Sequence, residues 1–183
     1  MQIPFKTDEF TPLAIKLRKG NSSAAEELYE KLFDKVFGFC MNKTSNRTSA
    51  EDLTQDIFLK LIDRIETFDE KKGNFLVWFW QLARNTVTDH YRKQKETHFS
   101  DIEESKVEDS AGHTLPNILE NSVEIQRVMS FLNTITPDEK ELFELHFVAD
   151  LKYRDISEIL GKPEGNLRVA VSRLKEKIRR NFA

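Results

Sequence analysis

The 183-residue chain has few of the features that mark secreted or membrane-spanning proteins. Cys40 is its only cysteine, so no internal disulfide can form and a reducing compartment suits the chain. No apolar run approaches the roughly 20 residues that a membrane-spanning helix needs. The N-terminal sequence MQIPFKTDEF has no apolar signal core. We therefore expect a cytoplasmic protein that does not insert into membranes.

The sequence also lacks the motifs of common enzyme sites. It has no glycine-rich phosphate loop and no nucleophile paired with a base. No second His or Cys lies at metal-ligand spacing from His146, so a packed helix residue is the better interpretation of this histidine. We therefore predict no catalytic activity, no cofactor and no bound metal.

Charge is distributed unevenly along the chain. The net charge is −3, but the segment His98–Glu120 holds six acidic residues against the single base Lys106. From Arg168 to the C-terminus there are six basic residues and one acid, Glu176. The chain is thus acidic in its middle and basic at its end, a distribution that says more about partners than the net charge does.

Apolar residues recur at spacings of three and four almost throughout, which predicts an all-α protein. Low apolar content, Gly112 and Pro116 indicate a flexible acidic linker between two small helical domains. Ser49 is a good candidate for a helix N-cap, and Thr136 with Glu139 is another. The predicted parts are an N-terminal helical extension (1–19), a first domain (20–96), the linker (97–117) and a second domain (118–183).

The segment Phe75–Glu96 is the most informative helix of the first domain. Phe75, Trp78, Phe79 and Leu82 fall on one face, which predicts their burial. Trp80 lies off this stripe and is either packed or exposed. The remaining surface carries Arg84, Asn85, Thr88, Asp89, Tyr91, Arg92, Lys93 and Lys95. Arginine and lysine neutralise phosphates, asparagine and threonine can bond base edges, and aromatic rings can stack on unpaired bases, whereas Asp89 is expected to be structural and to pair with a nearby arginine. An amphipathic helix with a solvated charged face explains the same pattern equally well.

A second motif lies near the C-terminus. Tyr153–Leu160 has helical spacing, Gly161 suits a left-handed C-cap, and Pro163 suits the first turn of the next helix. The basic helix Asn166–Arg180 follows. Two short helices joined by a glycine-containing turn are typical of a helix-turn-helix, and a helical hairpin with a basic surface is the alternative.

These motifs together resemble those of bacterial RNA polymerase sigma factors of the extracytoplasmic-function (ECF) type. The sequence AEDLTQDIFLKLI at Ala50–Ile62 is similar to the family's polymerase-binding motif, and WFWQLARNTVTDHYRK at Trp78–Lys93 is similar to its downstream-element helix. The C-terminal helix-turn-helix is the third motif. The resemblance implies a dissociable polymerase subunit that directs transcription initiation in a stress or envelope response.

The resemblance also implies site residues. Asp52, Gln55 and Asp56 match the positions that dock on the largest polymerase subunit; an acidic helix start that complements the macrodipole is the alternative. The turn Phe68–Asn74 matches a loop that holds a flipped-out base. The residues implied to bind the downstream (minus-ten) element are Asn74, Trp80, Arg84, Asn85, Thr88, Arg92 and Lys93. Those implied to bind the upstream (minus-thirty-five) element are Asn166, Arg168, Ser172, Arg173 and Lys175.

The recognition helix departs from the family pattern at two positions. Val169 and Ala170 stand where a polar and a basic residue are usual. Apolar contact with a thymine methyl is one substitute for direct base reading, and phosphate or shape readout is another. The expected partners are core RNA polymerase, promoter DNA and an anti-sigma factor, with a monomer when free. Two rivals stay open: a free-standing helix-turn-helix regulator and a degenerate sigma-like interaction protein.

Overall fold

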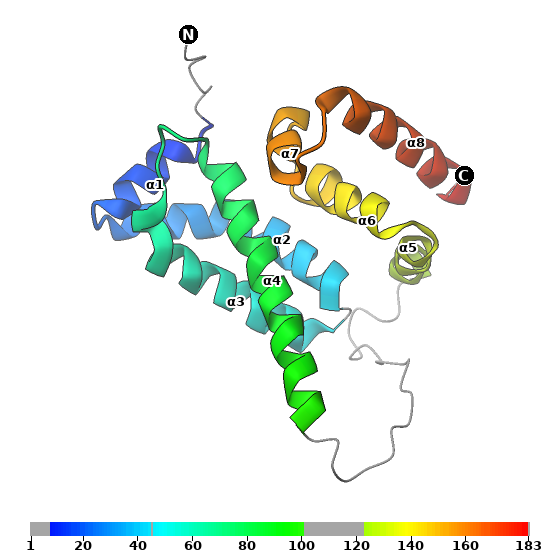
Figure 1. Cartoon of the computed structure of the whole chain (residues 1–183), viewed down its shortest axis with the longest axis horizontal. Helices are drawn as coiled ribbons and strands as arrows, with labels where there is room; N and C mark the ends of the chain where they lie inside the picture. The colour runs from blue at the N-terminus through cyan, green and yellow to red at the C-terminus, as the bar shows by residue number, and fades with distance from the viewer. Residues whose placement is uncertain (1–7, 45, 101–122, 183) are drawn as a thin grey trace.

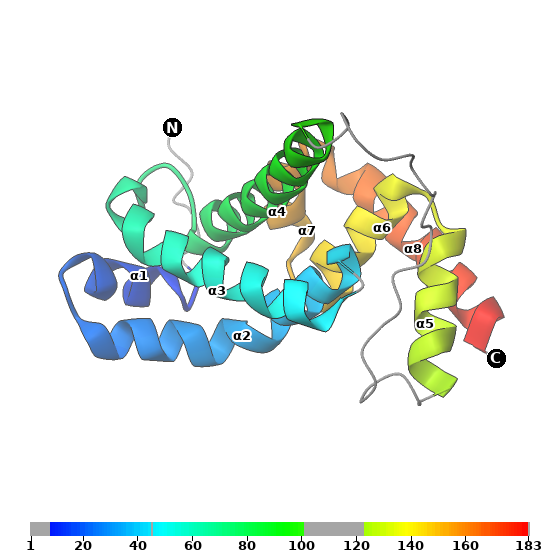
Figure 2. The same ribbon diagram turned by 90° about the horizontal axis from the view of Figure 1, so that it is seen from below.

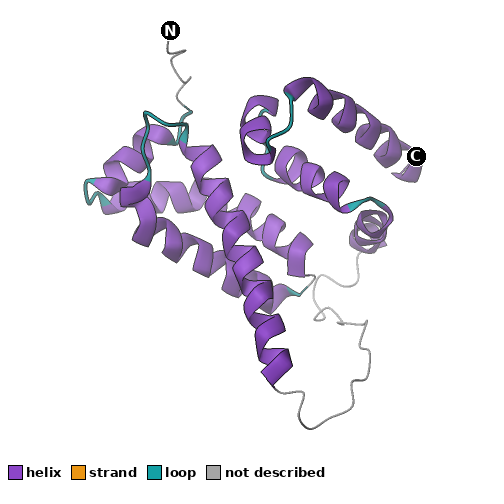
Figure 3. Cartoon of the chain, viewed as in Figure 1, coloured by secondary structure: helices purple, strands orange, loops and turns teal. Residues whose placement is uncertain are grey.

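The computed structural model describes residues 8–44, 46–100 and 123–182, and this part of the chain contains helices and no strands (Figure 3). The all-α prediction is therefore confirmed. The first domain comprises α1 (Thr11–Arg18), α2 (Ser22–Thr44), α3 (Arg47–Arg64), a 3₁₀ turn η1 (Ile65–Thr67) and α4 (Phe75–Ser100). The second comprises α5 (Val123–Thr134), α6 (Pro137–Phe143), a π-helical turn η2 (Glu144–Val148), α7 (Tyr153–Leu160) and α8 (Glu164–Phe182).

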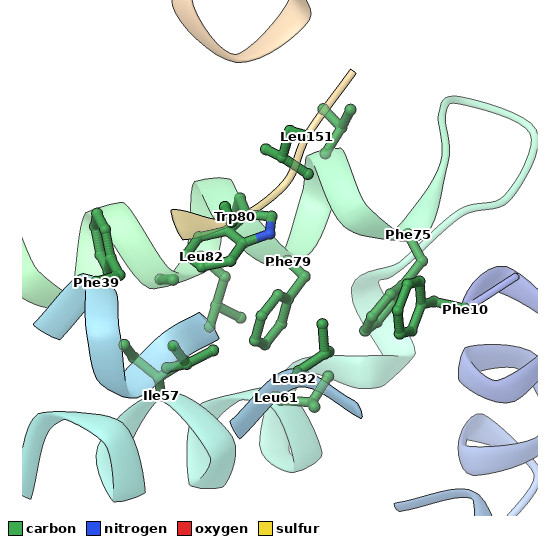
Figure 4. Close-up of a cluster of buried hydrophobic side chains, with 14 of the residues drawn as sticks. Phe10, Leu32, Phe39, Ile57, Leu61, Phe75, Phe79, Trp80, Leu82 and Leu151 are labelled. Atoms are coloured by element: carbon green, nitrogen blue, oxygen red, sulfur yellow. The ribbon is translucent and has the colours of Figure 1, made fainter. Parts of the chain in front are cut away.

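The core of the first domain is built from the predicted apolar stripes. Helices α2 and α3 pack along each other, and α1 packs on α2 (Figures 1 and 2). Aromatic rings of α4 fill the space between them, with Phe75 stacked on Phe79 at 5.6 Å (Figure 4). The fully buried residues of this core include Leu28, Leu32, Val36, Phe39, Leu53, Ile57, Leu61, Phe75 and Phe79.

Two helix boundaries differ from the predictions. Helix α3 begins at Arg47 because the side chain of Asn46 caps it, accepting a hydrogen bond from the Ser49 amide at 2.9 Å. Ser49 is therefore inside the helix, and its prediction as the N-cap was wrong. Helix α4 continues to Ser100, so it includes the first residues of the predicted linker; residues 101–117 of that linker lie outside the described residues.

The second domain follows the predicted capping signals. Thr136 and Glu139 form a complete capping box at the start of α6. Gly161 ends α7 with φ = 64°, a left-handed conformation that costs glycine little. Phe131 and Leu132 of α5 are buried against Leu174 of α8, whereas Val128 of the same helix is 37% exposed. The helix-turn-helix geometry of α7 and α8 is thus present.

The two domains pack against each other. Helix α7 lies beside α4, and η2 lies beside the C-terminal half of α2 (Figure 1). Leu145, Leu151 and Ile156 of the second domain belong to the same buried cluster as Phe79 and Trp80. Figure 4 shows Leu151 together with these two rings. Within the described residues, no helix is long and apolar enough to cross a bilayer. The packing of the domains determines which functional groups are exposed.

Candidate polymerase and nucleic-acid interfaces

The outer face of α3 presents the three predicted polymerase-binding residues. Asp52, Gln55 and Asp56 are all exposed, because the buried stripe of α3 occupies the opposite side of the helix. They line a shallow groove together with Leu59 of α3 and His90 of α4. Within the helix, Asp56 Oδ2 lies 3.3 Å from Lys60 Nζ, an exposed pair of small energetic weight. The three polar groups therefore form one accessible surface.

The helix-macrodipole interpretation of these acids is weakened by where α3 begins. Since Arg47 is the first helical residue, Asp52 lies in the second turn and Asp56 in the third. The favourable effect of a negative charge at a helix start falls off within the first turn. A partner surface is the better explanation for both carboxylates.

Two exposed apolar residues extend this face, and the sequence interpretation missed them. Leu59 is 61% exposed and Ile62 is 51% exposed. The sequence does indicate that they are exposed, because both lie off the buried stripe formed by Leu53, Ile57 and Leu61 although they are as apolar as that stripe. Large apolar groups beside acids at one accessible site are typical of a protein interface rather than of a solvated helix.

The outer side of α4 presents part of the predicted downstream-element surface. Asn85, Thr88, Arg92 and Lys93 are exposed. Asp89 pairs with Arg92 at 3.2 Å, which confirms its predicted structural role beside an arginine. The amide of Asn85 and the hydroxyl of Thr88 lie one turn apart and border a hollow shared with Tyr91. This surface has donors and acceptors suited to base edges and cations suited to phosphates.

The loop before α4 forms a cavity of about 260 Å³. Two aromatic rings lie in its wall, those of Phe68 and Trp78, with centroids 5.6 Å apart. Lys72 and Asp69 lie at the same cavity, and the second domain contributes Glu158 of α7. Aromatic faces beside polar groups suit an unstacked base, so the cavity is at the place where the sequence predicted a base-holding loop.

The two tryptophans differ from expectation. Trp80, predicted to bind DNA, is fully buried, with its ring edge-on to Phe39 at 5.4 Å. Trp78, predicted to be core, is only partly buried and lines the loop cavity. The reason is tertiary: α7 of the second domain packs on α4, where Arg84 reaches the Ile159 carbonyl and Trp80 belongs to one buried cluster with Leu151. The indole Nε1 of Trp80 has no hydrogen-bond partner within the described structure.

Two further predicted DNA contacts are occupied by groups of the second domain. Asn74 is 3% exposed; its Oδ1 accepts from the Val77 amide, and its Nδ2 donates to Asp155 Oδ1 at 2.7 Å. Arg84 forms an ion pair with Glu141 of α6 and reaches the Ile159 carbonyl of α7 at 3.4 Å. Asn74 and Trp80 are therefore buried away from DNA in this arrangement, and the Arg84 side chain, which is 30% exposed, is paired with Glu141, contrary to the expectation of an exposed face.

The recognition helix α8 presents most of the predicted upstream-element residues. Asn166, Ser172, Arg173 and Lys175 are exposed. Arg168 is exposed as well, but its guanidinium lies 4.7 Å from the centre of the Tyr153 ring and pairs with Glu164 at 3.1 Å. These contacts fix its direction before any DNA is bound.

The two unusual apolar residues of α8 have different surroundings. Val169 is 51% exposed, whereas Ala170 is partly buried against the domain core. The small side chain of Ala170 is thus explained by packing, and a thymine-methyl contact is left to Val169 alone. No group of three or more His, Cys, Asp or Glu side chains in the described ranges could hold a metal ion.

Comparisons with known proteins agree with the division of the chain into two helical domains. Residues 28–97 match the model of sigma-70 region 2, and residues 125–178 match that of sigma-70 region 4. The chain is 27% identical over 159 residues to the ECF RNA polymerase sigma factor SigM of Bacillus subtilis, covering 84% of this chain and 92% of SigM. It is 25% identical over 175 residues to SigW of the same organism, covering 91% of this chain and 93% of SigW.

Solved structures share the fold. CnrH, in complex with the cytosolic domain of CnrY, superposes with a TM-score of 0.67 at 18% identity, covering 94% of this chain and 96% of CnrH. The sigma factor RpoE of Bartonella quintana, in complex with the anti-sigma factor NepR, superposes with a TM-score of 0.59 at 22% identity. That superposition covers 86% of this chain and 97% of RpoE.

Proposed function

We propose a division of labour among three surfaces of this chain, which belongs to the ECF sigma factors of RNA polymerase. As a sigma factor it binds core polymerase and promoter DNA and directs transcription initiation; it is a regulatory subunit and not an enzyme. The proposal is that α3 docks on core polymerase, α4 and the loop before it bind the downstream element, and α8 binds the upstream element.

The observation that carries the α3 assignment is the shared exposure of acids and apolar groups on one rigid helix. Asp52 and Asp56 suit a partner rich in arginine, because charge-assisted hydrogen bonds to carboxylates are strong and directional. Leu59 supplies apolar area beside them. A free-standing helix-turn-helix regulator has no need of such a surface, so this feature favours the sigma factor over that rival.

The downstream assignment is supported by the chemistry around α4. Asn85 and Thr88 are exposed at the middle of the helix, and the loop cavity with Phe68 and Trp78 lies near its start. Melting a promoter requires a place for an unstacked base, and unstacking costs a few kcal/mol that stacking and hydrogen bonds must offset. Amide, hydroxyl and aromatic groups on one element supply such contacts.

The residues of α8 assigned to the upstream element make two kinds of contact, with base edges and with phosphates. We assign Arg168 to base edges, because it lies near the N-terminus of α8, which enters the major groove in helix-turn-helix proteins. We assign Arg173 and Lys175, further along the helix, to phosphates. The exposed Val169 adds apolar contact, and this retained surface argues against the degenerate-protein rival.

An anti-sigma factor is a further proposed partner. RpoE was solved with an anti-sigma factor, and CnrH with the cytosolic domain of another protein. A sigma factor of the same fold held inactive in this way suits an inducible stress or envelope response.

The experiment that tests the docking assignment is a charge reversal on α3. We expect Asp56→Arg to weaken binding to core polymerase by about 2–5 kcal/mol, since it places like charge against a basic partner. The control is Glu30→Arg, which makes the same charge change at an exposed position of α2. Affinity is measured with purified core, and circular dichroism checks the fold. If both variants bind core as the wild type does, the docking surface is not on α3.

A further inference from the structure

Helix α1 lies before the segment that matches sigma-70 region 2, which begins at residue 28. It packs on α2, on η1 and on the start of α4 (Figure 1). Its buried residues, among them Leu13 and Leu17, join the core of the first domain. Helix α1 and residues 8–10 before it therefore lie against both ends of the loop Phe68–Asn74. The inference below rests on the proposed function, which assigns an unstacked base to the cavity of this loop.

The end of the loop is held where α4 begins. The Phe75 amide donates to Thr11 Oγ1 at 3.1 Å, and the Leu76 amide donates to Asp8 Oδ2 at 3.3 Å. The third amide of the helix donates to Asn74 Oδ1 at 2.9 Å. The first four amides of a helix have no acceptor within the helix, so side chains that bind them fix the place where it begins. Two of these three acceptors come from α1 and the residues before it.

The two acceptors are themselves held in place. Asp8 Oδ1 accepts from the Phe10 amide at 2.8 Å, from the Thr11 amide at 2.6 Å and from the Thr11 hydroxyl at 3.1 Å. Thr11 is 2% exposed, so its hydrogen bonds are shielded from water. The Asp8 carboxylate lies at the N-terminal ends of α1 and α4, where a negative charge is favourable. One carboxylate thus connects the starts of the two helices.

The beginning of the loop is held by Arg18 of α1. Its Nη1 donates to the Phe68 carbonyl oxygen at 2.7 Å and to Glu70 Oε2 at 3.0 Å, and its Nη2 donates to Glu70 Oε1 at 3.2 Å. The hydrogen bond from Arg18 lowers the pKa of the Glu70 carboxyl. A pair with two such bonds fixes direction as well as distance. Because the Phe68 ring lies in the cavity wall beside Trp78, Arg18 holds the backbone that carries one of the two aromatic rings.

We infer that Asp8, Thr11 and Arg18 are positioning residues, which hold the loop before α4 in the geometry that accepts an unstacked base. Among the described residues that line the cavity, none comes from α1, so these three side chains act through the loop backbone and Glu70. A loop that is already ordered loses less conformational entropy when a base binds. An exposed ion pair contributes little to global stability, so the loss of the Arg18–Glu70 pair should change the loop rather than the whole fold.

Amide hydrogen exchange, followed by NMR in the full-length protein, tests the contacts without DNA. Thr11→Val replaces the hydroxyl with a methyl group of similar size and removes the acceptor of the Phe75 amide, which should exchange about tenfold faster. The control Thr86→Val removes a hydroxyl that is equally buried but bonds the Leu82 carbonyl within α4, and it should leave Phe75 unchanged. Circular dichroism verifies the fold. Wild-type exchange of Phe75 in Thr11→Val overturns the inference.

A second experiment measures what the positioning does for base binding. The complex with core polymerase binds promoter DNA whose downstream element is single-stranded and carries an abasic site at one position at a time. With the wild-type chain, loss of a stacked base should weaken binding about tenfold. Positions at which this loss disappears in Asn85→Ala belong to the α4 face, and the remaining ones belong to the cavity. Arg18→Ala should reduce the loss at the cavity position to about threefold or less and leave the Asn85 position unchanged.

The matched control is Lys31→Ala. It breaks another exposed ion pair of the same N-terminal segment, with Glu9 at 3.6 Å, which connects that segment to α2 rather than to the loop, and it should keep the wild-type pattern. Equal losses in Arg18→Ala and the wild type overturn the positioning role, as does a reduction at every position alike. If the wild-type complex loses affinity at no cavity position, the cavity holds no base, and the proposed function of the loop fails together with the inference.

Discussion

The Lys43–Glu144 pair gives the sharpest test of how the domains are held together. Glu144 of η2 is completely buried, and Lys43 Nζ lies 2.7 Å from its carboxylate. Burial raises the pKa of Glu144, and the positive charge of Lys43 opposes that rise. Lys43 itself is partly exposed, with its Nζ 5.5 Å from the centre of the Phe39 ring. Glu144 without Lys43 would be a buried charge with no partner, whereas Lys43 without Glu144 could still reach solvent. The two substitutions should therefore differ in their effect on the free energy of unfolding.

Removing the cation should cost much more than removing the negative charge. Lys43→Ala leaves a buried carboxylate without its partner, a change that costs about 3–5 kcal/mol for a fully buried pair. We expect a cost below this range, about 2–3 kcal/mol, because Lys43 is 28% exposed and solvent weakens its interaction with the carboxylate. Glu144→Gln removes the buried charge and leaves a lysine that can reach solvent, so its cost should be below about 1 kcal/mol. The double variant should recover most of the stability lost in Lys43→Ala.

The assay is urea denaturation followed by tryptophan fluorescence, with the free energy of unfolding compared among the three variants. The direction in which stability changes with pH follows from the raised pKa of Glu144. The folded state holds the Glu144 proton more tightly than the unfolded one, so its contribution favours folding at low pH and is lost as pH rises through the folded pKa. The penalty of Lys43→Ala should therefore be smaller at pH 5 than at pH 8. Equal costs for the two single variants, or no recovery in the double, would refute the reasoning.

Three further outcomes are expected. Asn85→Ala should relax the preference at one base of the downstream element and leave core affinity unchanged; selection on a randomised element measures this, and an unchanged preference at all positions removes Asn85 from readout. Arg168→Ala should cost about 1–3 kcal/mol at one upstream base pair, whereas Arg173→Ala should weaken all sequences and reduce the salt slope of DNA binding by about one unit. Equal weakening of every sequence by Arg168→Ala would mean that its contacts with Tyr153 and Glu164 are structural only. Gly161→Ala should destabilise the protein by about 1 kcal/mol in urea denaturation, because alanine is strained at φ = 64° although space is open around it.

Local chemistry in the sequence determined the helices and most of their ends. The i, i+4 spacing of Leu53, Ile57 and Leu61 indicates a buried face, and the structure buries all three. The capping box of Thr136 and the left-handed turn at Gly161 are also present as predicted. Signals of this kind reside in residues close together in the chain, so they can be interpreted without knowing the fold.

The predictions of the helix-turn-helix and of an exposed acidic face on α3 succeeded for the same reason. Asp52, Gln55 and Asp56 lie off a stripe that the sequence itself defines, so their exposure followed from periodicity. The N-cap of α3 was mistaken because Ser49 and Asn46 are both good capping residues. The structure places Asn46 at the boundary and Ser49 inside the first turn.

Only the tertiary structure decided which side of α4 is covered. Periodicity identified one apolar stripe but not the second domain that packs beside it. It therefore predicted that Trp78 is core and left Trp80 either packed or exposed, and the family resemblance assigned Trp80 to DNA. The second-domain partners of Asn74 and Arg84 lie 57 to 81 residues away in the chain, which no local pattern indicates. The sequence by itself determined the helices, their apolar faces and the family, because those depend on neighbours along the chain. The fold alone determined which polar groups are paired and which are free, because that depends on contacts between segments distant in sequence.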